Sequence, residues 1–190
     1  MSVEPVPTMR STITDEAGGL TIVMPSRRVL PFVIFLPIWI VGWALGECFA
    51  IGTLVSGKGG GSFPALFLGF WLTFWTIGGL FAMTAWSWMM FGRERLVVGS
   101  GRFVHSYELF GLARPREYDV QSIRGLHAAP NLFGNARAQS PFGAMGPGSG
   151  AITFDYGAKS VRIGSGLDEA EGKMIVQRIK DRGAIPNLGE

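Results

Sequence analysis

Two apolar stretches decide the fold of this chain: VLPFVIFLPIWIVGWALGECFAIGTLV, residues 29–55, and FPALFLGFWLTFWTIGGLFAMTAWSWMMF, residues 63–91. Glu47 is the only acidic or basic residue in the first stretch, and the second contains none. A helix needs about 20 apolar residues, at a rise of about 1.5 Å each, to cross roughly 30 Å of hydrocarbon. Both stretches are longer than this minimum. A soluble domain that buried two helices of this length in its core would need more than the 190 residues of this chain. We therefore expect two transmembrane helices at these positions.

The composition of the chain agrees with a membrane protein that also carries a water-soluble part. Hydrophobic residues make up 47% and charged residues only 16%, and the apolar excess is concentrated between residues 29 and 91. The net charge of +3 comes without a run of Lys or Arg, which argues against nucleic acid as a partner. The single cysteine, Cys48, excludes an internal disulfide.

The distribution of arginines around the two stretches predicts their orientation. Arg27 and Arg28 precede the first stretch, and Arg93 and Arg95 follow the second, whereas the connecting loop, residues 56–62, holds one lysine. Basic residues near the ends of spans remain in the cytoplasm. We expect a hairpin with an external loop and with both termini in the cytoplasm.

Short apolar alternations separated by glycines predict an antiparallel β domain in residues 93–183. Residues 20–28 read as the first strand of the same domain, so the hairpin is an insertion after that strand. Residues 167–182 have helical spacing, with carboxylates in the first turn and Gly183 after the last. The predicted class is α+β: a transmembrane hairpin inserted into a small barrel or sandwich closed by a C-terminal helix. The remaining segments are a flexible N-terminus at 1–19, a flexible loop at 130–150 and a tail at 184–190.

The stretch ITFDYGAKSVRIGSGLDEAE, residues 152–171, resembles a segment of bacterial two-span membrane proteins that carry a pleckstrin-homology-like domain. The order of strand, membrane hairpin, further strands and final helix is also similar in layout to the photosystem I assembly factor family. The resemblance implies a pleckstrin-homology-like fold, a location in the bacterial inner membrane, and a role in assembly or protein–protein interaction.

Glu47 and four glycines are the candidate contact residues within the apolar stretches. An ionisable group in lipid is costly and often functional, but a proton relay needs a second acid, His or Lys, and neither stretch has one. We therefore favour a structural or interaction role for Glu47, hydrogen-bonded to Thr73 or Thr76. Small residues allow helices to approach closely, which predicts helix packing or a partner contact. These glycines are Gly42, Gly46, Gly78 and Gly79.

The soluble part shows no catalytic or metal-binding pattern. The two histidines, His105 and His127, have no Cys or His at metal-ligand spacing. Asp155 and Lys159 could be read as a catalytic cluster, but a hairpin turn explains Asp155, and no nucleophile–base pair is evident. We expect no enzyme activity, no cofactor and no metal. Five arginines are candidates for contact with anionic lipid head groups. They are Arg93, Arg95, Arg114, Arg116 and Arg124.

These patterns predict a non-enzymatic membrane protein that presents a docking domain at the cytoplasmic face. Its expected partners are the lipid bilayer and another membrane protein or complex, with a second copy of this chain as one alternative. The alternative function is a module that senses anionic lipid through the five arginines.

Overall fold

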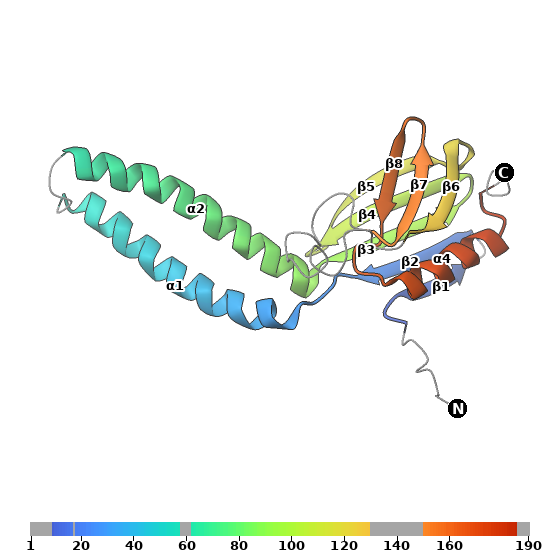
Figure 1. Ribbon diagram of the computed structural model, residues 1–190, viewed down its shortest axis with the longest axis horizontal. Coiled ribbons are helices and arrows are strands. Elements are labelled where there is room, and N and C mark those ends of the chain that lie inside the picture. The colour runs from blue at the N-terminus through green and yellow to red at the C-terminus, as the bar shows by residue number, and fades with distance from the viewer. Residues whose placement is uncertain (1–8, 17, 58–61, 130–149, 186–190) are drawn as a thin grey trace, which may run out of the picture. The chain divides into compact units, whose positions relative to one another are not determined.

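The computed structural model describes residues 9–16, 18–57, 62–129 and 150–185 and has an α+β fold (Figure 1). The chain divides into two units: a helical unit of residues 28–90, and a folded unit made of residues 1–27 and 91–190. The elements in chain order are β1 (Thr12–Glu16), β2 (Gly19–Pro25), α1 (Leu30–Val55), α2 (Ser62–Phe91), β3 (Arg93–Gly99), β4 (Arg102–Leu109), β5 (Leu112–Asp119), the short 3-10 helix η1 (Val120–Ser122), β6 (Ile123–Ala128), β7 (Ile152–Tyr156), β8 (Lys159–Ile163) and α4 (Glu169–Asp181).

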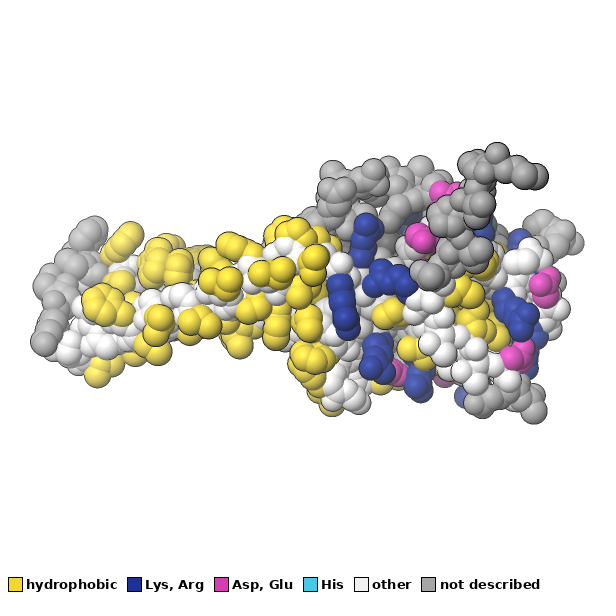
Figure 2. Space-filling view, turned by 90° about the horizontal axis from the view of Figure 1, so that it is seen from below, with side chains coloured by type: hydrophobic (Ala, Val, Ile, Leu, Met, Phe, Trp, Pro, Cys, Tyr) yellow, Lys and Arg dark blue, Asp and Glu magenta, His cyan; other side chains and the backbone are white. Residues whose placement is uncertain are grey.

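The helical unit consists of α1 and α2, and both helices are long and apolar enough to cross a membrane. Most of their large apolar side chains are exposed, and Figure 2 shows hydrophobic side chains along the whole unit. The two helices pack through a small cluster around Leu36, Ala82 and Met89. Arg28, just before α1, donates from Nη2 to the carbonyl of Met90 at 3.4 Å, near the negative end of the α2 dipole.

A proline explains one contact between these helices. Pro37 lies inside α1 and has no N–H, so the carbonyl of Val33, four residues earlier, has no helical donor. The indole N–H of Trp86 on α2 donates to that carbonyl at 3.2 Å. The carbonyl that the proline leaves unpaired in one helix is thus satisfied by the other.

The folded unit contains two antiparallel sheets, with orders β1-β2-β3-β4-β5 and β6-β7-β8, and not the closed barrel that was one form of the prediction. Inward-facing residues of β2 and β3 alternate with exposed ones, as in Leu20, Ile22, Leu96 and Val98. They form one core with apolar residues of the smaller sheet and of α4, which packs against β6 and β7.

Several predicted boundaries differ from the structure. Residues 12–16 form β1 within the segment expected to be flexible, so the helical insertion follows the second strand rather than the first. β2 and β3, on either side of the insertion, are direct neighbours, with Pro25 paired to Arg93. In the expected tail, Ile185 is buried in the core. The predicted loop lies outside the described residues except for its last residue, and so does most of the external loop.

Candidate functional site

Glu94 is a carboxylate at a core position of β3. The inward-facing residues of this strand are Glu94, Leu96 and Val98, and the Glu94 side chain is only 2% exposed. An unpaired carboxylate at such a position would be strongly destabilising, so its partners determine what it does.

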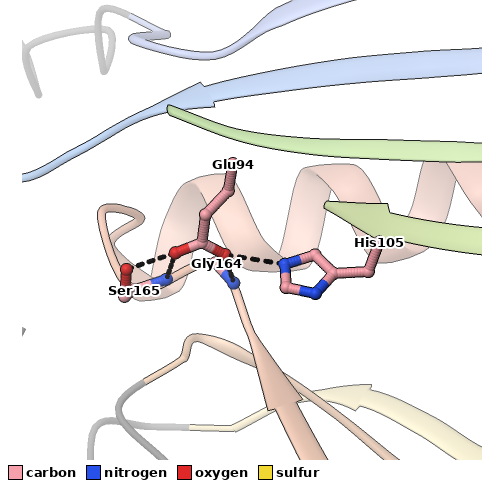
Figure 3. A network of polar contacts seen from close by, with 4 residues as sticks. All are labelled: Glu94, His105, Gly164 and Ser165. Carbon is pink, nitrogen blue, oxygen red and sulfur yellow. Dashed lines mark hydrogen bonds and ion pairs between the residues drawn. The ribbon is translucent and has the colours of Figure 1, made fainter. Parts of the chain in front are cut away.

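Three residues donate to the Glu94 carboxylate (Figure 3). The backbone N–H groups of Gly164 and Ser165 donate at 2.8 Å and 3.0 Å, and the Ser165 hydroxyl donates to Oε1. His105 Nε2, on β4, lies 3.1 Å from Oε2, and the His105 side chain is 3% exposed. The carboxylate therefore connects both β3 and β4 to the segment between β8 and α4.

The net effect of this environment is to lower the pKa of Glu94. Burial alone would raise the pKa, but the hydrogen bonds from His105 and Ser165, the charge interaction with His105 and the Gly164 amide together outweigh it. The charged form is the one these donors stabilise.

The geometry of this network fits a structural role better than acid–base catalysis. In a hydrolase triad the histidine bonds to the nucleophile and the carboxylate orients the histidine. Here the carboxylate stands between Ser165 and His105, so the serine hydroxyl donates to Glu94 and not to an imidazole. The only base that Ser165 contacts in this network is the Glu94 carboxylate, and its lowered pKa makes it a weak one.

His105 also lines a cleft of about 480 Å³ whose other residues come mainly from β4, β5 and β8. The cleft combines cationic and phenolic side chains: Arg116, Lys159, Arg162, Tyr107, Tyr118 and Tyr156. The imidazole of His105 meets the ring of Tyr107 edge-on, with centroids 4.7 Å apart. Burial, with the nearby Glu94 charge, raises the pKa of Tyr107 to about 12, so its hydroxyl remains a hydrogen-bond donor.

Among the described residues, the positive charge of the cleft is not balanced by an ion pair, because none holds Arg116, Lys159 or Arg162. Nη1 of Arg162 is buried without a hydrogen-bond partner there, which leaves a charged donor unsatisfied. Guanidinium groups and phenol hydroxyls together suit an anionic group such as a carboxylate or a phosphate.

The five arginines proposed for head-group contact lie in three different places. Arg93 and Arg95 occupy outward positions of β3, and Arg95 pairs with Glu108 at 3.2 Å. Arg114 and Arg116 are exposed residues of β5, in register with Tyr107 and His105, and only Arg116 of the five lines the cleft. Arg124 is in the smaller sheet, opposite Asp155. The structure does not gather the five into one patch.

Of the glycines in the helical unit, two face the other helix. A Cβ on Gly79 would lie 1.9 Å from the Trp43 ring, and one on Gly46 would be in ordinary contact with Trp75. Gly42 and Gly78 have open space around them instead. The Trp43 indole N–H donates to the carbonyl of Trp75 at 3.0 Å, which holds the ring over Gly79.

Glu47 lies opposite Thr76, whose hydroxyl donates to Glu47 Oε1 at 2.5 Å. Its second oxygen is buried without a partner in the described residues. Thr73, the other donor considered, bonds to the carbonyl of Gly69 in its own helix. The neighbouring Cys48 is exposed.

No family model matches this chain, and neither does any curated protein or solved structure. The function of the site is therefore inferred from its geometry alone.

The sequence analysis did not identify Glu94, Ser165 or the cleft as parts of a site. A signal for Glu94 was present, because the carboxylate occupies an inward position in line with Leu96 and Val98. No sequence pattern indicates the cleft, because its residues are far apart in the sequence and come together only when the two sheets pack.

Proposed function

We propose that this chain is a non-enzymatic membrane protein whose helical unit is an anchor and whose folded unit is a docking module. The anchor is supported by the exposed apolar side chains on both helices, which water would disfavour and lipid would accept. The arginines beside both helices support a hairpin with the folded unit in the cytoplasm, in keeping with the inner membrane of a bacterium.

The observation that carries the docking role is the cleft lined by Arg116, Lys159 and Arg162. It offers three cations and three phenols at one place. A partner protein that presents acidic side chains would pair with these cations. The Glu94 network supports this role by fixing the strand β4 and the end of β8, which form two walls of the cleft.

The folded unit also supports a pleckstrin-homology-like assignment as part of the proposal. The support comes from its two antiparallel sheets and from the helix α4 after the last strand. The alternative of anionic-lipid sensing through five arginines is weaker, because the five do not share a surface.

Site-specific photo-crosslinking in native membranes tests the docking role. A benzoylphenylalanine at position 159 in the full chain should give a discrete ultraviolet-dependent adduct with one protein, and Arg116→Glu should reduce that adduct severalfold. The matched control is Lys173, an exposed lysine on α4 outside the cleft. The docking role is wrong if position 159 gives no protein adduct, or if positions 159 and 173 give the same adducts.

A further inference from the structure

The turn between β4 and β5 exposes two large apolar side chains. Leu109 pairs with Leu112, so Phe110 and Gly111 are the two central residues of a tight hairpin turn. Phe110 is 65% exposed and Leu112 is 79% exposed. Both side chains thus remain largely exposed at the tip of the hairpin.

The residue at the first central position is unusual for the turn that the backbone adopts. Phe110 and Gly111 have φ values of 51° and 81°, the left-handed conformation that two-residue hairpins favour and that Asn and Gly adopt most easily. A bulky residue there is strained. The turn between β3 and β4 has the same geometry, with φ values of 51° and 77°, but carries Ser100 and Gly101. The chain thus uses a small polar residue at one turn and an aromatic one at the other, and strain of this kind is concentrated at functional positions.

The register of the sheet places the apolar turn beside the end of α2. Antiparallel pairing sets Glu108 of β4 opposite Arg93, which is the second residue after Phe91, the last residue of α2. The rings of Phe91 and Phe110, both in the folded unit, have centroids 5.1 Å apart. The Ser100 turn lies at the other end of the seven-residue strand β3, roughly 20 Å away at about 3.3 Å per residue.

Charge around the turn also suits a lipid surface. Arg93 and Arg114 are exposed and lie within two residues of the turn along the paired strands. Basic side chains next to apolar ones are typical of segments that lie in the membrane interface, where lipid phosphates meet the arginines and the acyl region meets the aromatic rings.

We propose that the turn Phe110–Gly111–Leu112 inserts into the cytoplasmic interface of the bilayer beside the end of α2. This inference rests on the proposed membrane anchor, because Phe91, which contacts the ring of Phe110, is the last residue of α2. The occupant of the apolar tip is lipid, and the turn is a third point of membrane contact after the two helices. It would limit rotation of the folded unit relative to the bilayer.

Spin labels on the full chain in liposomes that contain anionic lipid test the proposal. Three single-cysteine proteins are compared: the native Cys48 in α1, and Leu112→Cys and Ser100→Cys, each with Cys48→Ser. Cys48 and Leu112 are exposed, so labels there disturb little packing. We expect labels at 48 and 112 to collide preferentially with oxygen, which dissolves in lipid, and the label at 100 to collide with a water-soluble nickel chelate. Adding Phe110→Asn, which suits the turn but removes the ring, should shift the label at 112 severalfold toward the chelate.

The outcomes separate this inference from the anchor on which it rests. A label at 112 that is as accessible to the chelate as the label at 100, while the label at 48 is in lipid, overturns the inserted turn and leaves the anchor standing. A label at 112 that neither oxygen nor the chelate reaches would place protein over the tip, and it also overturns the inference. A label at 48 that is open to the chelate removes the anchor and the inserted turn together.

Discussion

Glu94 shows how a single residue can connect the parts of the folded unit. Its carboxylate takes hydrogen bonds from the segment after β8, and its other neighbour is His105 on β4. Although this position was not singled out from the sequence, the alternation of Glu94 with Leu96 and Val98 indicates an inward side chain that requires partners. It could not identify those partners, because Gly164 and Ser165 are about 70 residues away and are brought close only by the packing of the two sheets.

Replacing Glu94 with glutamine should lower the free energy of unfolding by about 2–4 kcal/mol, because an amide nitrogen would face donors that a carboxylate oxygen satisfied. Chemical unfolding of the full chain in detergent, followed by the circular dichroism of the β-sheet, measures the change. The control is Glu108→Gln on the outward side of β4, where loss of the partly exposed pair with Arg95 should cost under about 1 kcal/mol. Equal losses in the two variants would contradict the role given to Glu94.

The lowered pKa of Glu94 predicts how stability depends on pH. The folded-state pKa lies below the ordinary value of 4.5, so the stabilisation is complete above pH 4.5 and is lost as the pH falls through the folded-state value. The wild type should therefore lose stability more steeply than Glu94→Gln on acidification below pH 4.5. Unfolding curves recorded at a series of acidic pH values test this, and parallel curves would show that Glu94 does not contribute.

At the scale of elements, the apolar helices were the easiest to predict and the exposed strands the hardest. Length and composition alone located all four ends of α1 and α2 to within one residue. β1 was missed because Thr12–Glu16 is short and ends in two acids. The start of β5 was missed because nearly every residue of Leu112–Asp119 is exposed, which removes the alternation on which strand prediction depends.

The contact between Pro37 and Trp86 predicts a coupled pair of substitutions. Trp86→Phe should destabilise the hairpin by about 1–2 kcal/mol, since the Val33 carbonyl then has no donor. In a Pro37→Ala background the cost should shrink, because residue 37 now supplies its own N–H to that carbonyl. Unfolding of the four proteins of this cycle in mixed micelles gives the coupling energy, and a value near zero would contradict the pairing.

Gly78 and Gly79 are adjacent residues with opposite expected behaviour. Gly79→Ala should destabilise the hairpin by about 1–3 kcal/mol, because its Cβ would overlap the Trp43 ring and break the bond to Trp75. Gly78→Ala meets no neighbour and should be neutral or slightly stabilising, since alanine favours a helix. Thermal unfolding in detergent compares the two, and equal effects would show that the helices do not pack through Gly79.

At the scale of the whole molecule, the helical unit interrupts a sheet between two neighbouring strands. β2 and β3 are paired from Leu20 with Val98 to Pro25 with Arg93, so the chain leaves the sheet and returns to it at the same end. A two-helix hairpin meets that requirement because an even number of crossings brings the chain back to its starting side. Sequence reasoning predicted the insertion from the apolar lengths and Leu20–Met24, but the pairing that explains it required the structure.

The most direct test of this account is the sidedness of the two ends of the hairpin. In a Cys48→Ser background, Ser56→Cys places a thiol after α1, and Ser100→Cys places one in the turn between β3 and β4. A membrane-impermeant maleimide applied to intact cells, after the outer membrane is permeabilised where one is present, should label position 56. Position 100 should react only after the inner membrane is opened. Labelling of both positions in intact cells, or of neither, would contradict a membrane hairpin that carries the folded unit on the cytoplasmic side.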